Sequence, residues 1–263
     1  MGQLTAKNAG IVKLGDITVN RLGLGTNRIA DNNESRAALK RAVELGINFI
    51  DTAAKYGQSE MVIGQTLAPP RGLVAATKGG WSDDNDPASL QSQIDNSLEL
   101  LRLRQLPLWL LHRIDPKVPI EQTMNFLKSQ QAAGKIRHIG LSGVTIDQIE
   151  AARSAVDIVA VENHYNLMER EHDDVLEYCT REGIVFIPFF PLRSGSVTLN
   201  RRLQEMADKY QSSPIQIAIA WLLKRSPVML PIPGTLSIEH LEANVAAASI
   251  KLEEDDYHYL LGY

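Results

Sequence analysis

NFIDTAAKYG, residues 48–57, carries an apolar run into a polar loop. The first three residues are typical of a strand, and Asp51 falls where that run ends, as at the mouth of a parallel α/β barrel. Tyr56 follows Asp51 by five residues, a spacing that lets a short loop bring the phenol back over the strand end. The stretch therefore predicts a buried strand whose carboxyl end presents polar side chains.

Two further strand ends with polar side chains follow along the chain. The run at 73–77 (LVAAT) precedes Lys78, and the run at 106–111 (LPLWLL) precedes His112. Because the carboxyl ends of parallel strands meet at one face of a barrel, we expect these two side chains to join the aspartate and the tyrosine of the first stretch. Such a set suits the delivery of a proton to a carbonyl oxygen.

Strands and helices alternate along the whole chain. Alternating apolar and polar residues around Gly15-Asp16 predict a β-hairpin at 10–20, which we expect to plug the floor of a barrel. Strands are predicted at 22–25, 47–51, 73–77, 106–111, 136–141, 157–161, 184–188 and 228–232. Helices are predicted at 33–45, 59–68, 87–104, 120–133, 146–155, 171–182, 200–210, 214–225 and 237–248. This α/β pattern favours a (β/α)8 TIM barrel with an N-terminal β-hairpin, although a doubly wound sheet alternates in the same way.

Length, composition and net charge limit the classes of protein to which this chain can belong. The 263 residues, 44% hydrophobic and 22% charged, suffice for one large core without a linker, so we predict a single domain over 1–263. The formal net charge of −4 lacks the basic excess of nucleic-acid-binding proteins. The chain has neither an apolar signal core nor a run of ~20 apolar residues, which predicts a cytoplasmic protein that does not enter membranes.

Cysteine and histidine usage narrows the chemistry further. Cys179 is the only cysteine, so an internal disulfide and a cysteine-rich zinc site are excluded, as suits a reducing compartment. His112, His138 and His164 each stand alone, without the spacing of metal ligands. We therefore expect no metal.

Tyr56 is the candidate general acid. A free phenol has a pKa near ~10, so proton donation at neutral pH is helped by a cation that lowers that pKa, and Lys78 is placed to be this cation. Asp51 could hold Lys78 charged and in position, while His112 could donate to the substrate carbonyl. Each residue alone also has an ordinary structural explanation, such as packing for the tyrosine or solvation for the lysine. The order of all four at strand ends favours catalysis.

Several blocks of sequence resemble the aldo-keto reductase family. DTAAKYG at 51–57, TK at 77–78 and LLHRID at 110–115 resemble its signature blocks, and GKIRHIGLS at 134–142, VENHYNL at 161–167 and PIPGTLSIEHLEAN at 231–244 resemble its later blocks in the same order. The resemblance implies a barrel with NAD(P)H bound across its mouth and hydride delivery to an aldehyde or ketone. It also gives the tyrosine the role of acid, supported by Asp51, Lys78 and His112.

The resemblance further implies where the cofactor lies. Ser142 matches the serine that holds the nicotinamide carboxamide, Gly143 stands where the family usually has asparagine, and Glu162 replaces its usual glutamine. A carboxylate there can accept a hydrogen bond but cannot donate one, and its charge favours the oxidised ring. Phe189 falls where an aromatic ring stacks on the nicotinamide, or else packs in the core. Further cofactor contacts are implied at Gly25, Thr26, Asp51, Phe190, Pro191, Leu192, Arg193, Ser194, Gly195, Ile232, Pro233, Gly234, Thr235, Glu239, His240 and Asn244.

The last loop bears on the choice between NADP and NAD. Many relatives carry lysine and arginine where this chain has Gly234 and His240, so two cations that would pair with a 2′-phosphate are missing. Thr235 and Asn244 match the phosphate-binding hydroxyl and the adenine-contacting amide, and the start of the helix at 237–248 attracts phosphate. We expect NADP(H), with a modest preference over NAD(H).

The substrate is expected to be a small carbonyl compound, walled by Trp81, Tyr56 and His112. PFFPL together with IPGT is similar to a bacterial subgroup that includes pyridoxal reductases, so pyridoxal is one candidate, and a short C-terminal tail suggests an open pocket. The alternative is a non-catalytic NADP-binding regulatory subunit on the same fold, and the intact catalytic side chains argue against it. A barrel isomerase or metal-dependent hydrolase is less favoured. We expect a monomer or weak oligomer.

Overall fold

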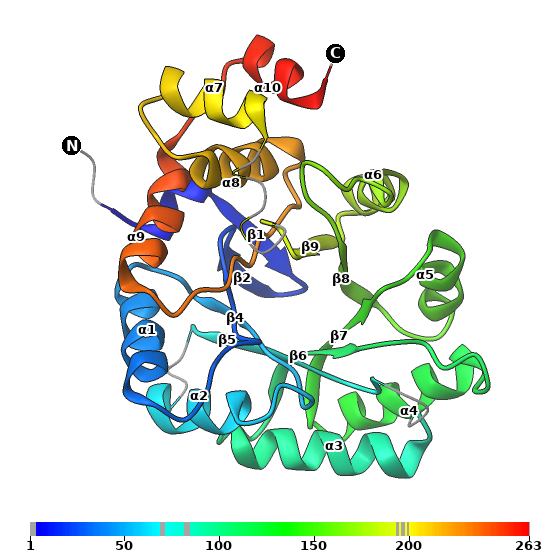
Figure 1. The fold of residues 1–263 in the computed structure, drawn as a ribbon. Coiled ribbons are helices and arrows are strands. Elements are labelled where there is room, and N and C mark those ends of the chain that lie inside the picture. The colour runs from blue at the N-terminus through cyan, green and yellow to red at the C-terminus, as the bar shows by residue number, and fades with distance from the viewer. Residues whose placement is uncertain are drawn as a thin grey trace.

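A curled parallel sheet with an N-terminal hairpin forms the framework of the protein (Figure 1). The computed structural model describes residues 4–68, 72–81, 85–192, 195, 198 and 200–262. The hairpin pairs β1 (Ile11–Leu14) with β2 (Ile17–Asn20). The parallel sheet contains, in spatial and chain order, β3 (Leu24–Gly25), β4 (Phe49–Asp51), β5 (Val74–Gly79), β6 (Leu106–Leu111), β7 (Ile136–Ser142), β8 (Ile158–His164) and β9 (Val185–Phe189). This order confirms the predicted barrel class and its hairpin.

An extended segment closes the sheet between its last and first strands. The N–H of Leu230 donates to the carbonyl of Phe186 in β9 (2.9 Å), and the N–H of Gly23, next to β3, donates to the carbonyl of Pro231 (2.9 Å). The strand predicted at 228–232 is therefore present as a connecting segment with a single β-bridge, not as a regular strand. The physical reason is that Pro231 has no N–H with which to extend a ladder.

Helices surround the sheet, as Figure 1 shows. They are α1 (Asn33–Glu44), α2 (Ser59–Leu67), α3 (Pro87–Leu100), α4 (Ile120–Ala132), α5 (Ile146–Arg153), α6 (Asp173–Glu182), α7 (Arg201–Lys209), α8 (Pro214–Arg225), α9 (Ile238–Ala246) and α10 (Glu254–Leu261). Several start at the caps that the sequence indicates. Asp86 accepts from the N–H of Ser89 (3.1 Å), and Thr145 forms a capping box with Gln148. No helix in the described ranges combines the length and apolar character needed to span a bilayer.

Two helical regions differ from the prediction. The helix α3 ends at Leu100, earlier than the predicted residue 104, because Arg102 adopts a left-handed conformation with φ of 57°. The C-terminal residues, which the sequence suggested were only a short tail, form α10. Its Asp256 accepts from Nζ of Lys209 (2.6 Å), which ties α10 to α7. Acidic residues in the first turn of α10 also favour this helix through its dipole.

The hairpin fills the amino end of the barrel. Leu14 and Val19 are buried in an apolar cluster with interior side chains of the sheet, including Phe49, Leu108 and Ile187. The barrel interior is therefore a packed core, as in other small barrels. Because the hairpin covers this end, a ligand must enter from the carboxyl ends of the strands, where the longest irregular connections lie.

The burial of the N-terminal hairpin yields a prediction about stability. Replacement of the fully buried Leu14 by alanine should lower the free energy of unfolding by about 2–4 kcal/mol, through lost apolar burial and the cavity left behind. Ile11 lies on the same strand but is 60% exposed, so Ile11→Ala should change that free energy by only about 0.5 kcal/mol. Urea unfolding followed by circular dichroism measures both. Equal losses in the two variants would show that the hairpin does not seal the core.

Candidate active site

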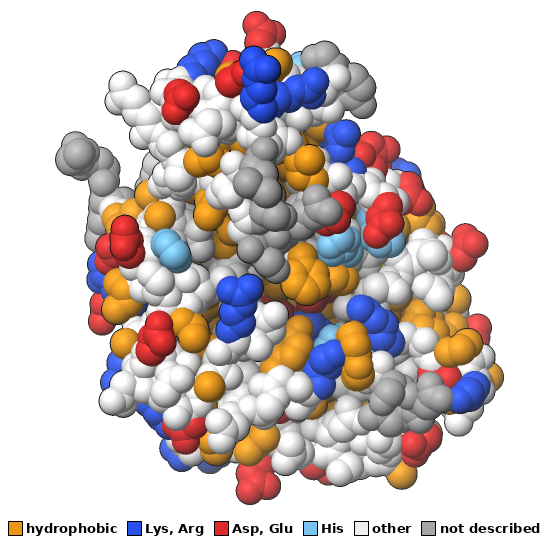
Figure 2. Space-filling model, viewed as in Figure 1, with side chains coloured by type: hydrophobic (Ala, Val, Ile, Leu, Met, Phe, Trp, Pro, Cys, Tyr) orange, Lys and Arg blue, Asp and Glu red, His pale blue; other side chains and the backbone are white. Residues whose placement is uncertain are grey.

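A cavity of about 610 Å³ opens at the carboxyl ends of the strands. Figure 2 shows hydrophobic, Lys or Arg, and His side chains around this hollow near the centre of the face. Its volume is typical of small-molecule sites. The predicted site residues that line it are Gly25, Thr26, Asp51, Tyr56, Trp81, His112, Ser142, Glu162, Phe189, Phe190, Pro191, Leu192, Gly195, Ile232, Pro233, Gly234, Thr235, His240 and Asn244. Lys78, Gly143 and Glu239 do not line it, and Arg193 and Ser194 lie outside the described residues.

Five residues that line the cavity were not predicted: Asn27, Arg28, Lys55, Arg113 and Ile215. A sequence signal existed for two of them. Lys55 precedes Tyr56 and Arg113 follows His112, so each is the chain neighbour of a predicted catalytic residue. The loop that presents the catalytic side chain presents its neighbour to the same cavity.

A buried ammonium group lies behind the cavity wall. Lys78, on β5, has no exposed side-chain surface; its Nζ forms an ion pair with Asp51 at the end of β4 and lies 3.2 Å from a carboxyl oxygen of Glu162 on β8. The same Nζ donates to the carbonyl of Thr52 (3.0 Å). Three strands thus bring three ionisable side chains together. The sequence predicted the contact between Asp51 and Lys78, and Glu162 joins them in the structure. Because the group is shielded from water, the ion pair of Lys78 with Asp51 is little screened by salt.

The two buried carboxyl groups differ in protonation from ordinary surface groups. Burial and the neighbouring Asp51 carboxylate, opposed by Lys78, raise the pKa of Glu162 to about 8. Burial also raises the pKa of Asp51, against the effect of Lys78. Burial disfavours a charged Lys78, but the two carboxyl groups outweigh this effect and raise its pKa. The raised pKa favours a protonated Glu162 at neutral pH, a form that can donate a hydrogen bond as well as accept one.

Tyr56 lies over this network. Its ring centre is 5.5 Å from Nζ of Lys78 and 6.1 Å from the ring centre of His112. Burial raises the pKa of Tyr56 to about 12, while Lys78 opposes the rise and Asp51 adds to it. The lysine thus acts in the expected direction, but the net shift is upward. Tyr56 consequently keeps its proton throughout the neutral pH range.

His112 is held neutral at the same end of the cavity. Burial lowers its pKa to about 2, and the positive charges of Lys78, Arg113 and Lys55 act in the same direction. A neutral imidazole donates a hydrogen bond from one nitrogen only. The ring centre lies 4.6 Å from that of Trp81, which flanks the cavity. His112 can therefore orient an oxygen atom without carrying a charge itself.

Arg113 occupies the space beside Gly143. A side chain on Gly143 would collide with the guanidinium of Arg113, and its φ of +65° also favours glycine. Nη1 of Arg113 donates to Oγ of Ser142 (3.3 Å) and to the carbonyl of His112 (3.0 Å). The guanidinium of Arg113, and not the residue at 143, therefore lines the cavity there.

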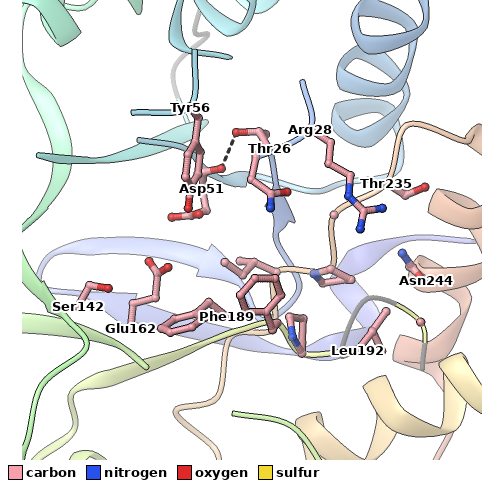
Figure 3. Close-up of a pocket in the computed structure, with 18 of the residues that line it drawn as sticks. Thr26, Arg28, Asp51, Tyr56, Ser142, Glu162, Phe189, Leu192, Thr235 and Asn244 are labelled. Carbon is pink, nitrogen blue, oxygen red and sulfur yellow. Dashed lines mark hydrogen bonds between the residues drawn. The ribbon is translucent and has the colours of Figure 1, made fainter. Parts of the chain in front are cut away.

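The other end of the cavity lies between the segment after β3 and the start of α9. Figure 3 shows Arg28 pointing toward the loop that carries Thr235, with Asn244 on the helix beyond it. Figure 3 also marks the bond from the Thr26 hydroxyl to the carbonyl of Asp51 (2.7 Å), which fixes the wall between the two ends. Arg28 is exposed and has no carboxylate partner within the part of the chain that the structure describes. It thus adds a free positive charge to this end.

Comparisons with known proteins identify the family and the fold of this chain. The model of the Aldo/keto reductase family matches residues 21–261. The chain is 43% identical to an uncharacterized oxidoreductase of Schizosaccharomyces pombe, covering 95% of this chain and 88% of that protein. It is 35% identical to pyridoxine 4-dehydrogenase of Escherichia coli, covering 92% and 94%. The crystal structure of an aldo/keto reductase from Klebsiella pneumoniae with NADP and acetate superimposes with a TM-score of 0.85 at 28% identity, covering 92% and 90%.

The protonation of Glu162 yields a prediction about stability and pH. Its pKa in the folded protein is raised, so the folded state binds the proton more tightly and wild-type stability falls as pH rises toward about 8. Glu162→Gln removes the group that loses this proton. The variant should therefore gain stability relative to wild type between pH 6 and pH 9, by on the order of 2 kcal/mol. Thermal unfolding at both pH values measures it, and a constant difference would contradict the assignment.

Proposed function

Because the chain belongs to the aldo/keto reductase family, we propose that it reduces an aldehyde or ketone to an alcohol with NADPH, and that Tyr56 is the general acid. The observation that carries the proposal is the placement of Tyr56 and His112 at one end of the cavity, with the ammonium of Lys78 below the phenol ring. These groups can deliver a proton to one oxygen atom. A protein that only binds a dinucleotide has no need of side chains that deliver a proton.

The cavity fits an extended dinucleotide. At its inner end the hydroxyl of Ser142 lies beside the carboxyl group of Glu162, and this pair suits a carboxamide (Figure 3). At its middle, Cβ atoms on Gly25 or Gly234 would lie within 2.8 Å of backbone oxygens of the opposite segment, so glycine keeps this wall flat. Aldo/keto reductases from Klebsiella pneumoniae were solved with NADP and with NADPH, which supports NADP(H) here.

Named residues would hold each part of that cofactor. Ser142 and Glu162 would bind the carboxamide, Phe189 would stack on the nicotinamide, and the backbone near Leu192 would face the phosphates. Arg28 supplies a cation at the end of the cavity where Gly234 and His240 replace the lysine and arginine of many relatives. We therefore assign to Arg28 the 2′-phosphate, together with Thr235, and Asn244 to the adenine.

The proton transfer follows from the charges of the site. When bound, the cofactor supplies a hydride to the carbonyl carbon. Neutral His112 donates a hydrogen bond to the carbonyl oxygen and orients it. Tyr56 gives its proton to that oxygen as negative charge develops there. The positive charge of Lys78 then stabilises the phenolate left on Tyr56, and the ion pair with Asp51 keeps the lysine charged.

An aromatic aldehyde is the substrate type that the pocket supports best. The indole ring of Trp81 lies next to His112 and offers a flat apolar surface to the body of a substrate. The similarity to pyridoxine 4-dehydrogenase supports a substrate of this shape, pyridoxal included. A non-catalytic NADP-binding subunit is the alternative, and the complete set of proton-transfer groups argues against it.

The role of Tyr56 is testable by removal of its hydroxyl. Tyr56→Phe should lower kcat with NADPH and 4-nitrobenzaldehyde by about 100- to 10,000-fold, since one general acid contributes about that much. The dissociation constant of NADPH should change by less than about threefold, because the ring remains. Absorbance at the dihydronicotinamide band and a fluorescence titration measure the two quantities. Turnover at the wild-type level would remove Tyr56 as the acid.

The role of Arg28 is testable by comparing two cofactors. Arg28→Gln should weaken NADPH binding by about tenfold or more, roughly 1.4 kcal/mol or above, and leave NADH binding within about twofold. Arg28→Lys keeps the charge and should lose less. Equal weakening of both cofactors would place the arginine at the pyrophosphate instead, and no effect on either would exclude it from the site.

A further inference from the structure

We propose that the carbonyl substrate carries an anionic group, a carboxylate or a phosphate, and that Lys55 and Arg113 bind that group at the rim of the cavity beside Trp81. This inference rests on the proposed function, since it names the class of substrate that the same site reduces. It is carried by the position of the two cations, by their lack of acidic partners among the residues that the structure describes, and by the other charges of the site.

Two cations face one exposed indole ring. Nζ of Lys55 lies 2.7 Å from the ring centre of Trp81, and the guanidinium carbon of Arg113 lies 4.9 Å from a ring centre of the same residue. Trp81 is 43% exposed, so this group of side chains, which we call the Trp81 rim, is open to solvent and to a ligand. An aromatic ring attracts both cations and holds them near each other without neutralising them.

Neither cation of the Trp81 rim has an acidic partner within the described ranges. Arg113 donates only to neutral oxygens, the Ser142 hydroxyl and the carbonyl of His112. Arg225, which is half-buried like Arg113, instead pairs with Asp173 at 2.9 Å. Partial burial and the charge of Arg113 lower the pKa of Lys55, which means that the two cations repel each other. An anion bound between them would relieve this repulsion.

The acidic groups of the site do not offset the rim. Asp51 and Glu162 are buried and turned to Lys78 behind the wall, and Glu162 is largely protonated at neutral pH. Counting only the side chains that the structure describes, the outer part of the substrate end is therefore positive. A substrate of the opposite charge is attracted to such a cavity, whereas a cationic one is repelled.

Chain connectivity places the rim where the far end of a substrate would lie. Lys55 adjoins Tyr56 and Arg113 adjoins His112, so the two residues proposed to act on the carbonyl oxygen each bring a cation with them. A substrate whose carbonyl is held by the tyrosine and the histidine lies against Trp81, and its other substituents extend toward solvent between the cations. A carboxylate or phosphate there would anchor the substrate in one orientation, since guanidinium binds either anion through paired hydrogen bonds.

The test compares charged aldehydes with neutral partners of similar shape. With saturating NADPH, kcat/KM is measured for 4-carboxybenzaldehyde against its methyl ester, and for 4-formylphenyl phosphate against 4-methoxybenzaldehyde. We expect the wild-type protein to prefer at least one anionic aldehyde by about tenfold or more, with a preference that falls as salt is raised. The pair that shows the larger preference identifies the anion as carboxylate or phosphate.

Variants assign the preference to the rim. The double variant Lys55→Gln, Arg113→Gln should reduce the ratio of anionic to neutral aldehyde to within about threefold of one, and each single variant should give an intermediate ratio. Lys40→Gln, on the exposed side of α1 and outside the cavity lining, is the matched control and should keep the wild-type ratio. The ratio is the readout, so a general loss of activity in a variant does not decide the question.

Different outcomes of these experiments would contradict the anionic substrate and the proposed reductase function. Equal kcat/KM values within both wild-type pairs, or a preference that survives in the double variant, would overturn the inference while leaving the reductase intact. If no aldehyde is turned over, the proposed function fails, and calorimetric titration of the same pairs into protein with NADP+ still tests the rim. Equal affinities within both pairs would then overturn it.

Discussion

The ion pair between Lys78 and Asp51, completed by Glu162, is the interaction on which the site depends. Removing such groups from water costs several kcal/mol for each charge, and only well-placed partners offset that cost. Lys78 has two carboxyl groups and the carbonyl of Thr52 as partners, all within the wall of the barrel. Apolar replacements of buried ion pairs are often no less stable, so stability alone does not account for the network, which agrees with the role that we propose for its positive charge beside Tyr56.

The same network bears on the role of general acid that we propose for Tyr56. A phenol with a pKa of about 12 loses little of its proton at neutral pH, as the proposed proton donor requires. The phenolate form is costly in a buried place, and the nearby ammonium group reduces this cost only when the proton leaves. Stabilisation that grows as charge develops is the kind that lowers a barrier.

Charge is arranged in two layers around the cavity. Behind the wall, one ammonium faces two carboxyl groups, one of them largely protonated, so the interior carries little net charge. At the open surface, Arg28 at one end and the Trp81 rim at the other are positive and free of acidic partners within the described ranges. The two ends therefore suit ligands with negative groups. NADP(H) at one end and an anionic carbonyl compound at the other would both meet this arrangement.

The fold and the inner site could be predicted from the sequence because both depend on local patterns. Alternating strands and helices indicate a barrel, and a barrel brings all strand ends to one face, so Asp51, Lys78 and His112 could be placed together by counting strands alone. The hairpin was likewise visible in its alternation around Gly15. These features require only periodicity and chain order.

Tertiary structure decided what depends on distance and burial. The upward shift in the pKa of Tyr56 and the protonation of Glu162 arise from desolvation and from charges on other strands, which no local pattern reports. Arg113 occupies the space beside Gly143, and Arg28 points toward the loop that carries Thr235, because loops from different strands meet only in the folded barrel. The sequence by itself thus determined the barrel and the groups at its strand ends, whereas only the fold decided their charges and which cations face the cavity.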